Sequence, residues 1–167
     1  MNAQRQIGEA LATALSGYTF AGPYASIDAA YRRRPDYTLE DLGTLKVSVV
    51  PGPYGMGTQF TIAGTLNASN TRGMHYVSTT FGIVLAKHIG STEEIEDLED
   101  LAQQVLDVIR SDLITLTGVP QGTVWSDFQQ PVPFDPDALG DRSVWMTQLE
   151  ITYAVPLVKV APPAPGP

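Results

Sequence analysis

Two histidines and a group of aspartates are the residues of this chain whose types could support catalysis or metal binding. Neither His75 nor His88 has a neighbour at the spacing of a metal-binding or catalytic pair, and we expect His88 to be solvent-exposed or to cap the helix that follows it. The Gly-x-Ser-x-Gly motif that presents a serine nucleophile in α/β-hydrolases is absent. Cysteine is also absent, which excludes disulfides, thiolate metal ligands and cysteine nucleophiles.

Asp135, Asp137 and Asp141 place three carboxylates within seven residues. Calcium binding is conceivable there, but the EF-hand spacing and its final glutamate are missing, and Asp-Pro and Gly-Asp turns explain the pattern more simply. The glycines at 52, 55 and 57 are interrupted by prolines and do not lead into a helix, so they do not predict a phosphate-binding loop. We therefore predict no metal, no cofactor and no catalytic residue, and expect a protein that is not an enzyme.

The most strongly patterned segment runs from Ser91 to Leu116 and predicts a long amphipathic helix. Ser91 with Glu94 three residues later is typical of a capping box, and Gly118-Val119-Pro120 ends the pattern. Apolar residues recur at intervals of three and four and form one stripe. The opposite face carries Glu93, Glu96, Asp97, Glu99, Asp100 and Asp107.

This predicted helix also holds most of the charge of the chain. From Glu93 to Asp112 there are eight acidic residues and one basic residue, which gives −7 of a total of −8. The acidic face is either a solvated surface that confers solubility, or a surface that lines a channel or meets a basic partner in an assembly. Arg32, Arg33 and Arg34 are the only clustered cations, and they serve either as that partner on a neighbouring copy or as a solvated strand edge.

Trp125 and Phe128 are large aromatic residues in a proline-rich segment, and we interpret them as core plugs or as contact anchors.

The composition, with 167 residues, 43% hydrophobic and 17% charged, is that of a globular domain. No apolar run approaches the roughly 20 residues that span a bilayer, and the N-terminus lacks a signal-peptide pattern, so we expect no membrane association. The excess of negative charge disfavours ordinary binding of nucleic acid.

The periodicities together predict an α+β fold. We expect a mostly antiparallel sheet of about four to five strands, covered on one face by an N-terminal helix and the long acidic helix, with the other face in water. The expected helix at 2–16 is followed by strands at 25–32, 44–50, 76–86 and 144–155, a projecting hairpin or loop at 54–75, and a region at 118–142 with at most a short strand at 123–128. Residues 1–160 are expected to form one domain, with a proline-rich tail at 161–167.

The order of these features is similar to that in the tail terminator and neck proteins, which join head to tail, of long-tailed bacteriophages. The resemblance spans roughly residues 5 to 155. It is carried by Ala29-Ala-Tyr31, Arg34-Pro35-Asp36-Tyr-Thr-Leu39-Glu-Asp-Leu42, Leu45-Lys-Val-Ser-Val49-Val-Pro51, Thr71-Arg72, the strand from Tyr76, the acidic helix, and Trp145-Met-Thr-Gln-Leu149-Glu-Ile-Thr-Tyr153. The tail at 161–167 and the loop at 118–142 have no counterpart in this resemblance.

The resemblance implies a structural virion protein that forms a ring, usually a hexamer, on the end of the tail tube. Its implied partners are copies of itself, the tail tube protein and proteins on the portal side of the head connector, and its implied location is the virion neck, assembled in the host cytoplasm. Genome DNA would pass through without specific binding, and the 93–107 face or the 54–75 segment would approach the lumen, because acidic groups repel phosphates.

Three other functions are alternatives to that of a tail terminator. One is a head-completion, connector or minor tail protein elsewhere in the neck. Another is a monomeric adaptor that binds proline-rich or acidic partners. The third is a small hydrolase that uses carboxylates of the acidic helix, which is the weakest because clustered surface carboxylates are ordinarily solvated groups.

Overall fold

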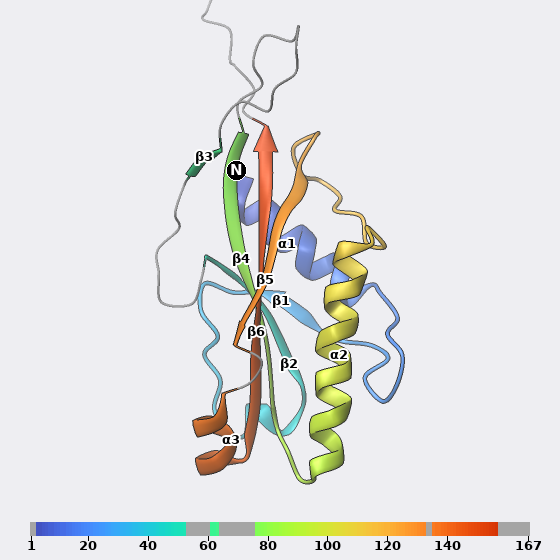
Figure 1. Cartoon of the computed structure of the whole chain (residues 1–167), viewed down its shortest axis with the longest axis vertical. Helices are drawn as coiled ribbons and strands as arrows, with labels where there is room; N and C mark the ends of the chain where they lie inside the picture. Colours follow the sequence, from blue (N-terminus) through green and yellow to red (C-terminus); the bar gives the residue numbers. More distant parts are fainter. Residues whose placement is uncertain (1–2, 53–60, 64–75, 133–134, 157–167) are drawn as a thin grey trace, which may run out of the picture.

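A computed structural model describes residues 3–52, 61–63, 76–132 and 135–156, and it has the α+β architecture expected from the periodicities (Figure 1). Its elements are α1 (Ala3–Ser16), β1 (Ala29–Tyr31), the 3₁₀ helix η1 (Asp41–Gly43), β2 (Lys46–Pro51), β3 (Thr61–Ala63), β4 (Tyr76–His88), α2 (Thr92–Arg110), β5 (Val124–Val132), α3 (Pro136–Arg142) and β6 (Val144–Pro156).

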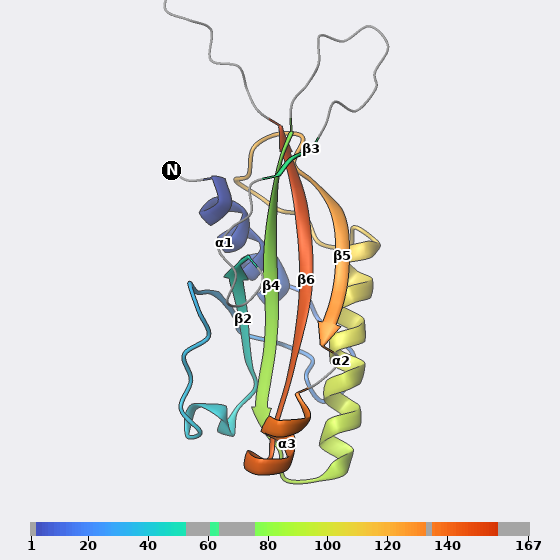
Figure 2. The same ribbon diagram turned by 60° about the vertical axis from the view of Figure 1, so that its left-hand side comes forward.

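The strands form one sheet in the order β1-β2-β4-β6-β5, and the short β3 pairs with the beginning of β4. Only β1 and β2 are parallel among the described strands; every other pairing is antiparallel. β4 and β6 have 13 residues each and pair along their whole length, from Tyr76 with Pro156 to His88 with Val144. These two strands form the central axis of the elongated molecule (Figure 2). The prediction of a mostly antiparallel sheet is therefore confirmed.

Both long helices cover the same face of the sheet, as the amphipathic patterns predicted. Alternate residues of β4 and β6, such as Phe81, Ile83 and Ile151, point to this face and are completely buried. They belong to one core cluster with Ile7, Leu11 and Leu15 of α1 and with Leu98, Leu101 and Val105 of α2. Full burial of each such side chain contributes about 1.5–3 kcal/mol, so this layer dominates the stability of the fold.

The opposite face is only partly in water, which corrects the expectation of a wetted second face. Ser48 on this face is fully buried, and Val84 is 3% exposed. The cause is the segment at 35–42, which folds over one half of this face: the Tyr37 hydroxyl and the Ser48 hydroxyl share a hydrogen bond, and Leu42 packs with Ala86 and Val144 in a second small cluster. Further along the sheet, half-exposed polar pairs such as Thr80 and Thr152 match the prediction.

The acidic helix ends at Arg110 and not at Leu116, because the chain makes a Schellman turn there. The amide of Asp112 donates to the carbonyl of Ile109, and the amide of Leu113 donates to the carbonyl of Val108. Asp112 adopts a left-handed backbone with φ 50°, a role that glycine usually fills. At the other end Ser91 is the N-cap residue, but its side chain makes no capping hydrogen bond, and the Glu94 carboxylate accepts from the amide of Gly90 and not from that of Ser91, so the predicted capping box does not form.

The region at 118–142 contains more regular structure than its sequence predicted. It includes all of β5 and α3, where we expected at most a short strand at 123–128. Two bulges in the pairing of β5 with β6 interrupt the alternation of apolar residues, which explains why the period was not visible. The strand expected at 25–32 is shorter, Ala29–Tyr31. Of the expected hairpin at 54–75 only β3 lies within the described residues, and the tail at 161–167 lies outside them.

Candidate functional site

The outward face of α2 is an uncompensated acidic ridge. Glu93, Glu96 and Asp100 are exposed, and Asp97 is half-buried at the flank of the helix. In the described part of the chain none of these four carboxylates forms an ion pair. Like charges three and four residues apart on a helix repel by a few tenths of a kcal/mol per pair, so the ridge is a local cost to the subunit.

Glu94 differs from the rest of the acidic cluster because it is held in place. Its Oε2 atom accepts hydrogen bonds from the backbone amide of Gly90 and from Nζ of Lys87, both at 3.1 Å. These hydrogen bonds, first that from Gly90 and then that from Lys87, lower the pKa of Glu94 below its ordinary value. Glu94 therefore fixes the turn between β4 and α2 and is not available to a partner.

The three arginines follow β1 and are all exposed. The Arg32 guanidinium lies over the ring of Tyr37, 5.3 Å from its centroid, and Arg34 pairs with Asp36 at 3.4 Å. Both members of that ion pair are 77% exposed, so the pair contributes little and its arginine can exchange partners. Among the described residues Arg33 forms no ion pair. The cluster thus presents positive charge that the subunit itself neutralises only in part.

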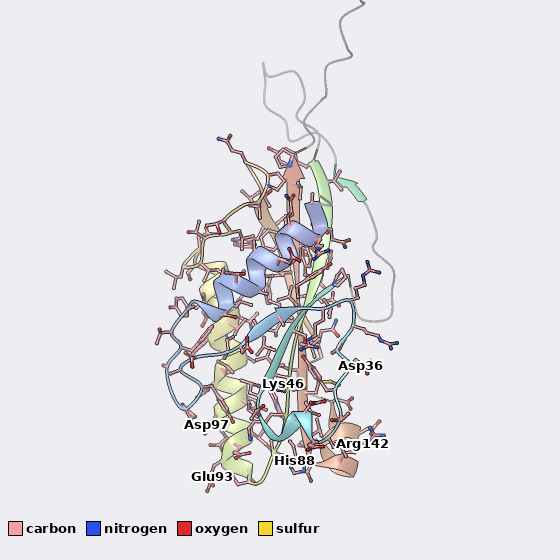
Figure 3. All side chains as sticks on the ribbon, turned by 180° about the vertical axis from the view of Figure 1, so that it is seen from behind. Asp36, Lys46, His88, Glu93, Asp97 and Arg142 are labelled. Atoms are coloured by element: carbon pink, nitrogen blue, oxygen red, sulfur yellow. The ribbon has the colours of Figure 1, made fainter. Side chains whose placement is uncertain are left out.

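The acidic ridge and the arginine cluster lie on opposite flanks of the molecule. Figure 3 places Glu93 and Asp97 on one side and Asp36, the ion-pair partner of Arg34, on the other. The structure therefore does not bring the two predicted charged sites together within one subunit. Two surfaces of opposite charge on opposite flanks can meet only between different copies of the chain.

Trp125 and Phe128 are both half-buried and pack against the main core from β5. The indole Nε1 of Trp125 donates to Oδ1 of Asp112 at 2.9 Å, and the Arg110 guanidinium lies 5.7 Å from the centre of the Phe128 ring. Within the subunit these residues close the end of the core beside the C-terminus of α2, in agreement with their interpretation as core plugs. Their role as contact anchors stays a prediction.

Two hollows were not foreseen from the sequence. One, of about 510 Å³, lies on the second sheet face between the 35–42 segment and α3, and its walls include Tyr37, Leu39 and Met146. The other, of about 490 Å³, lies beside the C-terminus of α2 and contains Trp125 and Tyr153. Two of the exposed large apolar residues in the described part of the chain line these hollows, Leu39 the first and Val124 the second.

The residues considered for catalysis or metal binding lie apart. His88 ends β4 and is exposed, as expected, at the same end of the molecule as Glu93 and Arg142 (Figure 3). Oδ1 of Asp135 accepts from the amide of Asp137 at the start of α3, which makes it a helix cap. The described residues contain no group of three histidine or acidic side chains that could hold a metal ion, and His75 and the side chain of Asp141 lie outside them.

Neither protein-family models nor curated proteins yield a match to this chain. In the part of the chain that the structure describes, no helix is long and apolar enough to cross a lipid bilayer.

Proposed function

We propose that this chain is a structural subunit of a bacteriophage virion that assembles into a ring, caps the tail tube and joins the tail to the head connector. The observation that carries the proposal is the pair of oppositely charged flanks, one on α2 and one after β1. The resemblance to tail terminator and neck proteins supplies the biological context, and the α+β core under a long amphipathic helix is compatible with it.

Opposite charges on opposite flanks favour a heterologous, head-to-tail contact. Each copy then offers the acidic ridge to one neighbour and the arginines to the other, and a fixed rotation between neighbours closes a ring. Such a contact also relieves the repulsion along the ridge, because arginines from the next copy lie among Glu93, Glu96 and Asp100. The repulsion between the carboxylates of the ridge therefore destabilises the isolated subunit and is relieved on assembly.

The position of the protein in the particle tests the proposed function most directly. Antibody labelling of native virions, viewed by electron microscopy, should mark the joint between head and tail. Label at a ring closer to the head would support a head-completion or connector role instead. Particles that carry no label, although the antibody recognises the purified chain, would reject a virion role.

A triple variant, Glu96→Lys with Asp97→Lys and Asp100→Lys, separates two uses of the acidic ridge. If the ridge contacts the arginines of the next copy, as we propose, the variant should fail to form rings because like charges then face each other. If the ridge lines the lumen, rings should form but genome passage should be slowed, since lysines bind phosphates. If the variant forms normal rings and infectivity is also normal, the ridge neither contacts the next copy nor lines the lumen.

A monomeric adaptor is the second candidate function, and the hollow on the second sheet face favours it. Tyr37, Leu39 and Met146 offer an apolar surface at which a partner peptide could bind. Measurement of the mass in solution, in the presence and absence of tail tubes, distinguishes the two: an adaptor stays monomeric under both conditions, whereas a ring subunit associates at least on the tube.

A further inference from the structure

The hollow beside the C-terminus of α2 has the properties of a binding site. Its walls are mainly apolar and come from Ile109, Ile114, Leu116, Val119, Trp125 and Tyr153, and its volume is about 490 Å³. Asp112, in its left-handed conformation, is also part of the lining and holds the Trp125 indole in place by the 2.9 Å hydrogen bond.

Tyr153 contributes a phenol group to the wall of this hollow. Its side chain is 4% exposed, its ring packs edge-on against Phe81, and it forms part of the wall of the hollow. Burial, and secondarily the charge of Asp112, raise the pKa of Tyr153, so the hydroxyl stays protonated. A protonated phenol hydroxyl can donate a hydrogen bond to a carbonyl oxygen that enters the hollow.

We propose that the proline-rich C-terminal segment, residues 161–167, of a second copy of this chain docks in the hollow. Its sequence, Ala-Pro-Pro-Ala-Pro-Gly-Pro, favours the polyproline II conformation, in which the carbonyl groups have no internal partners and the proline rings fit against aromatic side chains. Lys159, the only charged residue after Pro156, then lies within reach of the Asp112 carboxylate. The proposal deepens the proposed ring function, because it rests on association between copies.

The direction of the chain favours a second copy over the same one. Pro156 ends β6 beside Gly122, and Tyr153 lies three residues back along the strand, about 10 Å away. To enter its own hollow the chain would have to reverse at once, but residues 157–160, Leu-Val-Lys-Val, contain none of the residues that build tight turns. Eleven residues in an extended polyproline conformation reach about 34 Å, enough to cross to a neighbouring subunit.

The test uses a full-length tail variant, Pro162→Ser with Pro163→Ser and Pro165→Ser, whose hollow is left free. A synthetic peptide of residues 157–167 is titrated into it, and the indole N–H signals of the two tryptophans are followed by NMR. We expect the Trp125 signal to shift, while that of Trp145, which is completely buried in the core, stays fixed as an internal reference. In the unmodified chain the Trp125 signal should depend on protein concentration.

Tyr153→Phe in the tail variant should weaken peptide binding about two- to tenfold, the effect of one hydrogen bond. The matched control is Tyr24→Phe, which removes a hydroxyl from a half-buried tyrosine outside the hollow and should leave the affinity unchanged. The proposal is overturned if the peptide shifts neither tryptophan signal, or if the serine-substituted peptide binds equally well. It is also overturned if the Trp125 signal depends on the tail but not on concentration, since the tail would then occupy its own hollow. If rings persist in the tail variant, the docking of the tail in the hollow of a second copy is rejected, whereas the contact between the charged flanks is not.

Discussion

Gly8 lies on the buried face of α1, against the rings of Tyr31 and Phe81, and a single added methyl group should matter there. A Cβ atom at this position would be 2.4 Å from the Tyr31 ring and 3.0 Å from the ring of the fully buried Phe81. Glycine weakens a helix by about 1 kcal/mol relative to alanine, so its presence here is explained by packing and not by helix formation.

We predict that Gly8→Ala destabilises the protein by about 1–2 kcal/mol, because the cost of overpacking, about 1–3 kcal/mol, exceeds the gain in helix propensity. Urea denaturation of the purified chain measures the effect. The control is Gly140→Ala in α3, where the new methyl group would meet nothing within 4 Å, and there we expect a gain of about 0.5–1 kcal/mol. An increase in stability for both variants would show that α1 can move away from the sheet without cost.

At the scale of single elements, the start of α2 depends on Glu94 and should make stability sensitive to acid. The pKa of Glu94 in the folded chain lies below its ordinary value of 4.5, through its hydrogen bonds from Gly90 and Lys87. A carboxyl group with a depressed pKa stabilises the fold above its unfolded pKa, and this contribution is lost as the pH falls through the folded value.

We predict that Glu94→Gln lowers the urea midpoint at neutral pH, and that the difference from the unmodified chain shrinks as the pH falls below 4.5. Denaturation curves measured at several pH values check this. Glu99→Gln, on the exposed side of the same helix, should not lower the urea midpoint at neutral pH. A difference between Glu94→Gln and the unmodified chain that stays constant down to strongly acidic pH would mean that the charge of Glu94 is not what stabilises the turn.

The contrast between the two ends of α2 shows what the sequence can and cannot predict about an element. The apolar spacing predicted the helix and the face that it buries, since Leu98, Leu101 and Val105 all enter the core. The same spacing continued past the true end, because Leu113 and Leu116 keep the period after the backbone has turned. Only the left-handed conformation of Asp112 ends the helix there, and aspartate in that position has no distinctive sequence signal.

The charged surfaces could be predicted from the sequence, but their arrangement and the hollow around Tyr153 could not. Charge is visible in a sequence, so the acidic ridge and the arginines could be named from their residue types alone. Their arrangement on opposite flanks depends on the sheet order β1-β2-β4-β6-β5, which local patterns do not reveal. The hollow around Tyr153 joins β5, β6 and the loop after α2, and its chemistry arises only when these distant segments meet.

At the scale of the whole molecule, a head-to-tail ring makes a prediction that no symmetric contact shares. One variant carries lysine in place of Glu96, Asp97 and Asp100, so both of its flanks are positive. The other carries glutamate in place of Arg32, Arg33 and Arg34, so both of its flanks are negative. Alone, each variant should stay monomeric, because every possible contact between its two flanks joins like charges.

Mixed in equal amounts, the two variants should assemble, since each flank of one chain then meets the opposite charge on the other. The mixed ring must alternate, so it can close only if the number of subunits is even, as in the hexamer that the resemblance implies. Mass measurement of the mixture at low salt, on tail tubes where these are needed for assembly, gives the result, and higher salt should weaken the mixed ring by screening. Assembly of either variant alone to the same size as the unmodified chain would show that the charged flanks do not hold neighbouring copies together.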